Sequence, residues 1–325
     1  MLQVHLAALS LLLSAPAELA KGMVVSCPGM GETWGEPEMQ VALQELKQLG
    51  TTWVELHPYA GVETDGRIRF RPAAQTRFLG RGAAFVKASG LSLYWVPHLA
   101  YWGRFDWRGT INFGKDQEAW ARFFEGYQAF IVDQAKFAES VGAPMFAVGL
   151  EYEATMDHEA EWRRIIAAVR AVYRGQLVYA ANWNGLDRVR FWDAVDLIGV
   201  QGYFPLAKGS NPSDAELRAA WDRPLLYLAE LSQAYQKPVL FNELGYARSK
   251  QAAVRPWEPA NDDSTEAIEL RRRLLAIGLE RVQAAPFVRG VFLWKWIPGR
   301  AFFDRDFSMR DPEAQAVLQR YWKNQ

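Results

Sequence analysis

The chain contains 325 residues with a mass of 36.9 kDa, and its 37 lysines and arginines balance its 37 aspartates and glutamates. This neutral balance excludes the basic surface that nucleic-acid binding requires, and the composition, half apolar and 23 % charged, is typical of a globular protein rather than a disordered or membrane-spanning one. The single cysteine, Cys27, excludes an intramolecular disulfide and a cysteine-based zinc cluster.

Residues 6–15 form an apolar run, which is followed by two small-residue patterns, Ala15-Pro16-Ala17 and Glu18-Leu19-Ala20. This order predicts a signal peptide over residues 1–20, a secreted or periplasmic protein, and a catalytic domain over residues 21–325. Because no lysine or arginine precedes the run, the alternative is an ordinary N-terminal extension from a misassigned start, which would leave the protein in the cytoplasm. The run is shorter than the roughly 18 residues that a membrane span needs, as is every other apolar stretch, so we expect no membrane span.

From residue 22 onward, short apolar runs alternate with longer stretches that place apolar residues at helical spacing, as in 120–137 and 162–173. The strand-like runs are residues 23–28, 52–57, 91–98, 144–151, 176–183, 196–203, 238–243 and 288–296. Eight strand–helix units without a linker or a shift in composition predict an α/β fold, a single (β/α)8 TIM barrel.

A dinucleotide-binding fold is the alternative, because Gly29, Gly31 and Gly35 follow the first strand and Glu55 lies about 20 residues further on. The fit is poor, since the third glycine is one residue late and Trp34 would crowd a pyrophosphate. Eight units also exceed the six of that fold.

Two helix starts and one charged helix face are marked locally. Ser213 with Glu216 predicts a capping box, and Asp311 followed by Pro312 predicts a capped helix with proline at its first position. We interpret the charged run over residues 269–273 as the solvated face of the seventh helix.

Two glutamates terminate otherwise apolar strands: Glu151 ends the fourth, and Glu243 ends the seventh. In a barrel, catalytic residues lie at the carboxyl ends of strands, and two facing carboxylates are the apparatus of glycoside hydrolysis. A separation of about 5 to 5.5 Å gives retention of configuration, and about 6.5 to 9.5 Å gives inversion. The alternative is that each glutamate simply pairs with an arginine at the rim.

Four motifs around these strand ends carry a resemblance to a known family. They are Val148-Gly149-Leu150-Glu151, Tyr179-Ala180-Ala181-Asn182-Trp183, Ile198-Gly199-Val200-Gln201-Gly202-Tyr203-Phe204-Pro205-Leu206 and Pro238-Val239-Leu240-Phe241-Asn242-Glu243-Leu244-Gly245-Tyr246. From about Lys21 to the last helix, the chain resembles glycoside hydrolase family 113, the retaining endo-β-mannanases of clan A. The resemblance implies that Glu151 is the general acid/base and Glu243 the nucleophile. It also implies that Tyr203 hydrogen-bonds the nucleophile and that Trp294 or Trp296 forms a platform under the sugar.

The sequence departs from the clan at one position. Many clan A enzymes place an asparagine immediately before the acid/base to contact the sugar 2-hydroxyl, whereas Leu150 stands here. That contact either comes from Asn182 or is missing, which leaves the identity of the substrate open.

Further residues near strand ends are candidates for substrate binding. His57 closes the second strand and His98 the third, with Trp102 just beyond, and we expect them to hydrogen-bond or stack against a sugar. The alternative, a metal site at the two histidines, lacks a third ligand at matching spacing, so we expect no metal. Glu153, two residues after Glu151, is the alternative acid.

Aromatic residues make up 14 % of the chain, and their flat faces suit sugar rings. Trp34 and Trp183 are either further platforms or packing residues. These residues together predict a glycosidase that needs no cofactor, acts on a β-linked glycan and implies no partner protein. A barrel that binds carbohydrate without cleaving it, and a transglycosylase with the same covalent intermediate, remain the alternative functions.

Overall fold

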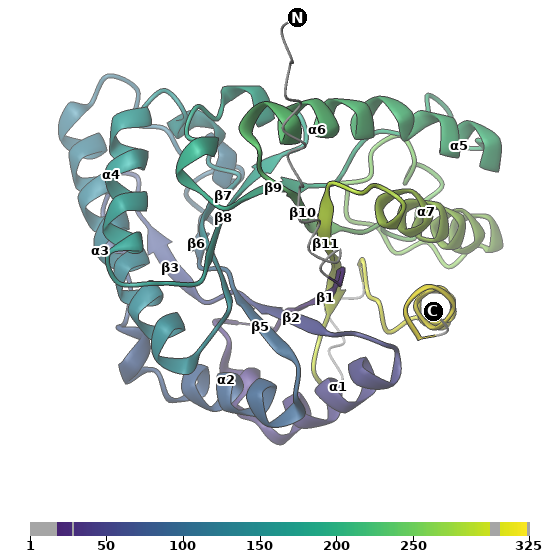
Figure 1. Ribbon diagram of the computed structural model, residues 1–325, viewed down its shortest axis with the longest axis horizontal. Helices are drawn as coiled ribbons and strands as arrows, with labels where there is room; N and C mark the ends of the chain where they lie inside the picture. The colour runs from purple at the N-terminus through teal and green to yellow at the C-terminus, as the bar shows by residue number, and fades with distance from the viewer. Residues whose placement is uncertain (1–17, 28, 300–305, 324–325) are drawn as a thin grey trace, which may run out of the picture.

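The computed structural model describes residues 18–27, 29–299 and 306–323. In these segments, parallel strands close into a barrel in the order β1-β11-β10-β9-β8-β7-β5-β2, which Figure 1 shows end-on. The barrel strands are β1 (Ala20–Val25), β2 (Trp53–Leu56), β5 (Ser92–Trp95), β7 (Met145–Leu150), β8 (Gln176–Asn182), β9 (Leu197–Gln201), β10 (Val239–Leu244) and β11 (Val288–Trp296). The predicted (β/α)8 barrel is confirmed.

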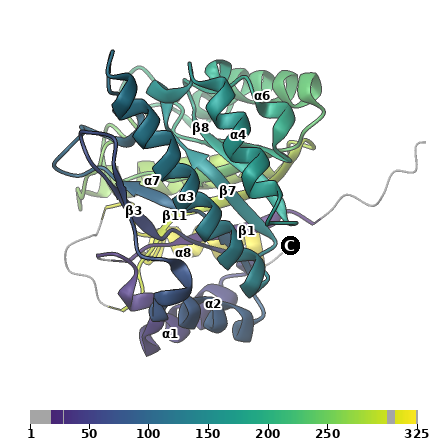
Figure 2. The same cartoon turned by 90° about the vertical axis from the view of Figure 1, so that its left-hand side faces the viewer.

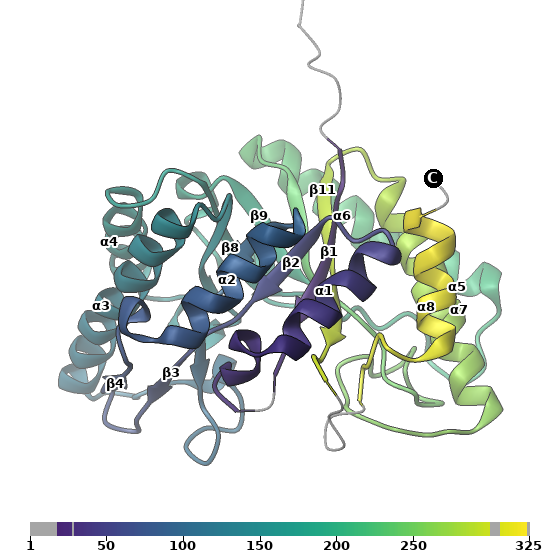
Figure 3. The same cartoon turned by 90° about the horizontal axis from the view of Figure 1, so that it is seen from below.

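Helices surround the barrel, with α1 and α2 outside β1 and β2 (Figure 3) and α3 and α4 outside β7 and β8 (Figure 2). The helices are α1 (Pro37–Gln48), α2 (Arg77–Ser89), α3 (Gln117–Val141), α4 (Glu159–Arg170), α5 (Asp214–Ala220), α6 (Asp222–Tyr235), α7 (Thr265–Gln283) and α8 (Pro312–Leu318). Among the described helices, none combines the length and the apolar character that crossing a membrane requires.

Each predicted strand-like run overlaps one barrel strand, and the run 91–98 also includes the first residue of a strand outside the barrel. Pro97 interrupts it, since proline cannot donate to a strand ladder, and β6 (His98–Ala100) then pairs with β3 (Tyr59–Val62) in a small separate sheet. β4 (Ile68–Arg69) completes that sheet. At the other end of the chain, β1 starts at Ala20, and residues 1–17 of the predicted signal peptide lie outside the described residues.

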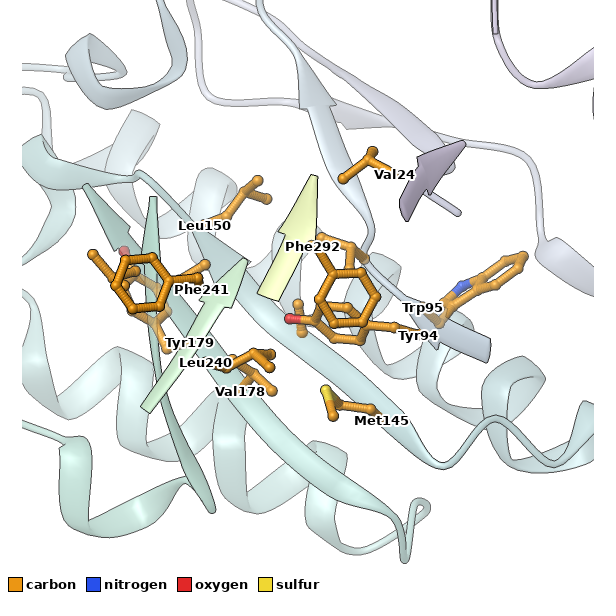
Figure 4. Close-up of a cluster of buried hydrophobic side chains, with 14 of the residues drawn as sticks. Val24, Tyr94, Trp95, Met145, Leu150, Val178, Tyr179, Leu240, Phe241 and Phe292 are labelled. Carbon is orange, nitrogen blue, oxygen red and sulfur yellow. The ribbon is translucent and has the colours of Figure 1, made fainter. Parts of the chain in front are cut away.

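The barrel interior is a packed core rather than a channel (Figure 4). The rings of Tyr94 and Phe292 lie 5.1 Å apart inside it, and the Asn242 amide donates a 2.6 Å hydrogen bond to the Tyr94 hydroxyl. A Cβ at Gly22 would lie 2.3 Å from the Phe292 ring, so glycine is what lets this ring fill the interior. A closed interior leaves the ends of the strands as the place for a binding site.

Both predicted helix starts are confirmed in position, but only the first has the predicted capping hydrogen bonds. Ser213 and Glu216 form the capping box of α5, with each side chain accepting a hydrogen bond from the other residue's backbone N–H. Asp311 precedes Pro312 at the start of α8, but its side chain makes no capping hydrogen bond and instead pairs with Arg271 at 2.7 Å.

The predicted solvated face of the seventh helix is wrong at Arg271, which is 0 % exposed. Its guanidinium donates to the carboxylates of Asp311 and Glu313 and to the carbonyls of Tyr246 and Ser308. A charged side chain can be buried when its donors are satisfied in this way, which periodicity alone does not reveal. Arg271 thereby joins α7 to the loop after β10 and to the start of α8.

Replacing Arg271 with alanine should therefore lower the free energy of unfolding by about 3 kcal/mol, because it leaves two partly buried carboxylates and two carbonyls without their partner. Arg272→Ala is the matched control. Its exposed pair with Glu269 should contribute no more than about 0.5 kcal/mol. Urea denaturation followed by circular dichroism measures both variants, and equal losses would contradict the structural role of Arg271.

Candidate active site

A cavity of about 560 Å³ opens at the carboxyl ends of the barrel strands. Its lining residues are Tyr101, Trp107, Arg108, Glu151, Asn182, Trp183, Asn184, Tyr203, Glu243, Trp257, Trp294 and Phe307. Other cavities in the described structure have similar volumes, but this one contains both glutamates that end apolar strands. The paired carboxylates, rather than size, identify it as the candidate active site.

Glu243 lies on β10, 7 % exposed, and both of its carboxylate oxygens accept a hydrogen bond. Gln201 at the end of β9 donates to one oxygen at 2.8 Å, and the Tyr203 hydroxyl donates to the other at 2.7 Å. The predicted contact of Tyr203 is thus present in the structure. Burial raises the pKa of Tyr203 well above its usual value, and the charge of Glu243 raises it further, so the phenol stays protonated and can donate.

Glu151 directly follows β7 and turns away from the strand direction. Its φ of 56° lies in the left-handed region, which is uncommon for a residue with a side chain, while its backbone N–H still bonds to the Ala180 carbonyl at 2.8 Å. Because the strand ends here, Glu151 and Glu153 do not lie on the same side of a strand, contrary to the expectation from the sequence. Strained backbone of this kind costs about 1 to 3 kcal/mol and is found preferentially at functional sites.

Arg108 is a cation that lies beside the acidic groups in the cavity. It lies on the short 3-10 helix Arg108–Thr110, and its Nε is 3.8 Å from a carboxylate oxygen of Glu151. Its Nη1 is 3.2 Å from Nδ1 of His98, which can only accept from a guanidinium. His98 therefore holds Arg108 in place as a neutral base, and burial, which lowers the pKa of His98 well below its usual value, is consistent with that state.

The two glutamates have different electrostatic surroundings. Burial raises the pKa of Glu151 to about 7, Arg108 opposes the rise, and Glu243 adds to it. Burial also raises the pKa of Glu243, but hydrogen bonds from Tyr203 and Gln201 and the charges of Arg108 and Lys295 oppose this. Within the described residues, the Glu151 carboxylate accepts no comparable hydrogen bond. The surroundings of Glu243 therefore favour its anion more than those of Glu151 do, and Glu151 is the group whose protonated form is favoured near neutral pH.

His57 and His98 do not reach the cavity, contrary to the predicted sugar contacts. Both are 0 % exposed, and the His57 ring stacks between His98, at 4.7 Å, and Trp294, at 5.8 Å. His57 directly follows β2, and its ring supports the Trp294 ring, whereas His98 begins β6 and supports His57 in turn.

The structure does supply a third metal-ligand type next to these histidines. Glu55, His57 and His98 have candidate ligand atoms within 4.8 Å of one another. However, the two imidazoles are stacked with only 15° between their planes, so their nitrogen lone pairs do not converge on one point. Arg108 also occupies Nδ1 of His98. The donor set fits a neutral buried network better than a metal ion.

The structure separates the other predicted residues into those that line the cavity and those that do not. Trp294, Asn182 and Trp183 line it. Trp296 is buried elsewhere under the guanidinium of Arg310, because β11 carries one extra residue relative to β1 between Leu293 and Trp296, which breaks the two-residue alternation.

Trp102 and Trp34 also lie outside the cavity lining. Trp102 is 51 % exposed and packs on Tyr59, whereas Trp34 is fully buried and donates to the Val25 carbonyl. The alternative acid, Glu153, is likewise outside, and its carboxylate accepts a 3.2 Å hydrogen bond from the Asn182 amide.

Several residues in or next to the cavity were not predicted from the sequence. Gln201 ends an apolar strand, so the rule that identified Glu151 and Glu243 could also have found it. Arg108 and Trp257 come from long loops, where no periodic pattern marks them. The Trp257 ring stacks on Trp183 at 5.9 Å and extends the aromatic wall of the cavity.

Comparisons with known proteins identify the family of this chain. The sequence model of glycoside hydrolase family 113 matches residues 25–310. A family 113 β-1,4-mannanase superposes with a TM-score of 0.82 at 23 % identity, over 95 % of this chain and 100 % of that chain. The family 113 β-mannanase AaManA from Alicyclobacillus acidocaldarius, in complex with ManMIm, superposes with a TM-score of 0.78 at 27 % identity, over 94 % and 97 % of the two chains.

A family 5 mannosidase from Rhizomucor miehei shares the fold, with a TM-score of 0.60 at 10 % identity over 94 % of this chain and 92 % of that chain. No curated protein sequence matches the chain. The family 113 match covers most of the chain and includes both strand-end glutamates, Glu151 and Glu243. The chain therefore belongs to glycoside hydrolase family 113 and is a glycosidase.

Proposed function

We propose that the protein is a retaining glycosidase that hydrolyses β-mannan by double displacement, with Glu243 as nucleophile and Glu151 as general acid/base. The observation that carries this proposal is the contrast between two carboxylates in one cavity. Glu243 accepts two short hydrogen bonds that favour its anion, whereas burial raises the pKa of Glu151 to about 7. Opposite protonation states in a carboxyl pair are what this chemistry requires.

In the first step, the ionised Glu243 attacks the anomeric carbon, and the glycosidic C–O bond breaks as Glu151 gives its proton to the leaving oxygen. The product is a glycosyl ester on Glu243, and Glu151 is left ionised beside Arg108. In the second step, Glu151 takes a proton from water, the water oxygen attacks the anomeric carbon, and the ester bond breaks. Both carboxyl groups return to their starting states, so no cofactor is required.

The proposal of mannan as substrate is supported by the family and by the cavity walls. Two solved family 113 proteins that superpose on this chain are a β-1,4-mannanase and a β-mannanase. Trp294 offers a flat face, with the His57 ring stacked behind it to hold its position. Leu150 has no polar group that could bind the sugar 2-hydroxyl. Asn182 lines the cavity, but its amide already donates to Glu153, which limits its freedom to make that contact.

Glu243→Gln should lower kcat for mannooligosaccharides by about 10⁴-fold or more, because the amide cannot form the ester. Glu151→Gln should lower it by about 10² to 10⁴-fold, and by much less for formation of the intermediate from an aryl glycoside whose leaving group needs no proton. Glu153→Gln is the matched control, since it lies outside the cavity lining. Steady-state kinetics on folded variants measure these losses. Turnover retained in folded Glu243→Gln would contradict the mechanism.

The wild-type protein should release the β-anomer first, as proton NMR detects, and should cleave mannan in preference to other β-glycans. Initial release of the α-anomer would show inversion and exclude a covalent intermediate. Product sizes distinguish internal from terminal cleavage, and products longer than the substrate would show transglycosylation. Binding without cleavage of every β-glycan tested would favour the carbohydrate-binding barrel.

The pH profile of kcat/KM should fall as the pH rises through about 7, because the protonated form of Glu151 is then lost. Arg108→Met removes a positive charge that lowers the pKa values of both Glu151 and Glu243, so both limbs of the profile should move to higher pH. Arg104→Met removes an exposed arginine of the same loop that pairs with Glu63, and it should leave both limbs in place. Unmoved limbs in a folded Arg108→Met protein would limit Arg108 to a structural role.

A further inference from the structure

One buried acid close to the candidate active site has no part in the proposed mechanism. Glu55 is 1 % exposed and lies on β2, which is placed between β1 and β5 in the barrel (Figure 1). Its Oε1 is 3.5 Å from Nδ1 of His57, at the limit of hydrogen-bond distance. Glu55 does not line the cavity, so it can influence a reaction there only through another residue.

The immediate surroundings of Glu55 do not compensate a negative charge. Within the described segments, no lysine or arginine nitrogen lies within ion-pair distance of its carboxyl group, and its Oε2 has no hydrogen-bond donor. The guanidinium of Arg108 is directed to Glu151 and to His98 instead. Because an unpaired buried carboxylate is costly, this geometry favours the neutral carboxylic acid.

The charged and titratable groups around Glu55 and His57 come from several elements. They are Tyr59 on β3, Tyr94 on β5, Arg108, Tyr203, Glu243 on β10 and Lys295 on β11. Burial and the charge of Glu243 raise the pKa of Glu55 well above its usual value, against the opposing charge of Arg108. Burial and the charges of Arg108 and Lys295 lower the pKa of His57 to about 3. Glu55 and His57 are therefore both neutral near neutral pH and do not form an ion pair.

A neutral carboxyl group is a suitable partner for a neutral imidazole. Such an imidazole has one donor and one acceptor nitrogen, and a carboxylic acid also carries both a donor and an acceptor, whereas a carboxylate can only accept. The Nε2 of His57 is 3.2 Å from the Ser26 hydroxyl, and its Nδ1 faces Glu55. Ser26 and Glu55 therefore hold the two nitrogens of one ring.

The orientation of His57 matters for the cavity because its ring is stacked on both sides. Trp294, which lines the cavity, lies at 5.8 Å, and His98 lies at 4.7 Å on a nearly parallel plane. His98 in turn accepts from Arg108. A residue that fixes His57 therefore acts on the aromatic wall of the cavity and, one ring further on, on the base that holds Arg108.

We propose that Glu55 is a positioning residue for the glycosidase reaction: as a neutral carboxylic acid, it pairs with Nδ1 of His57 and fixes the imidazole that supports Trp294. This inference rests on the proposed function, since it assigns Glu55 to the site that contains Glu151 and Glu243. A neutral Glu55 supplies hydrogen-bonding capacity without adding a third negative charge beside those two carboxyl groups.

Glu55→Gln and Glu55→Met test the pairing with His57. The glutamine amide is neutral and has both a donor and an acceptor, so kcat/KM for mannooligosaccharides should stay within about twofold of the wild type. Methionine has a similar length but cannot pair with Nδ1, so kcat/KM should fall about tenfold. Glu118→Met is the matched control, because Glu118 is 89 % exposed on α3, and it should keep the wild-type value.

The pH profile reports the charge of Glu55. Because an amide in place of a neutral acid removes no charge, both limbs of the kcat/KM profile should stay in place in Glu55→Gln. If Glu55 were a carboxylate, the same substitution would remove a negative charge that raises the pKa values of Glu151 and Glu243, and both limbs would move to lower pH.

Infrared difference spectroscopy detects the proton on Glu55 without measuring activity. At a pH above the alkaline limb, Glu151 is ionised, and the difference between wild type and Glu55→Gln should still contain the C=O stretch of a protonated carboxyl group. This measurement decides the protonation state of Glu55 even where Glu55→Met does not fold.

The outcomes separate this inference from the proposed function. Activity retained in Glu55→Gln, lost in folded Glu55→Met and accompanied by the protonated carboxyl band supports the positioning role. Equal activities of the two folded variants would show that His57 needs no polar partner and would overturn it, as would limbs that move to lower pH or a missing band. If the folded wild type cleaves no mannooligosaccharide, the proposed function is wrong, and the band still decides whether Glu55 is the neutral partner of His57.

Discussion

The central constraint on this structure is the burial of several carboxyl groups around the cation Arg108. A buried carboxylate is costly unless a charge or a hydrogen bond compensates it, and each acid meets that cost differently. Glu243 accepts hydrogen bonds from two side chains, and Glu151 relies on Arg108 at 3.8 Å. Burial and the charge of Glu243 raise the pKa of Glu55 well above its usual value, which favours its neutral form. The three acids therefore differ in how their burial is compensated: by hydrogen bonds at Glu243, by a nearby charge at Glu151, and by a raised pKa at Glu55.

The surrounding structure maintains this arrangement. The neutral His98 accepts from Arg108, and its ring stacks on His57, which in turn stacks under Trp294. The same buried network therefore orients the cation beside Glu151 and supports the aromatic ring that lines the cavity. The positions of the cation and of the aromatic ring therefore depend on the same buried residues, as is common where the supporting groups of an active site are buried.

Beyond the carboxylates, the barrel places aromatic loops on one side of its mouth. Trp183 lines both the candidate active-site cavity and a second cavity, and Trp257 stacks on Trp183. Loops at the carboxyl ends of barrel strands vary without disturbing the core, so ligand preference can be set there independently of the barrel itself. Arg271, which joins α7 to two of these connecting segments, shows how the rim is held to the barrel by buried charge as well as by apolar packing.

The sequence by itself determined the barrel and the two glutamates, because strand alternation and the polar residue that ends an apolar strand are local patterns. It did not determine Arg108, whose role depends on a long loop folding over the strand ends, or the burial of Arg271, which depends on partners far along the chain. It also could not choose Trp294 over Trp296, since an irregularity in the pairing of β11 with β1 decides which ring faces the cavity. Contacts between distant segments and shifts in strand register are tertiary properties, and only the folded barrel decides them.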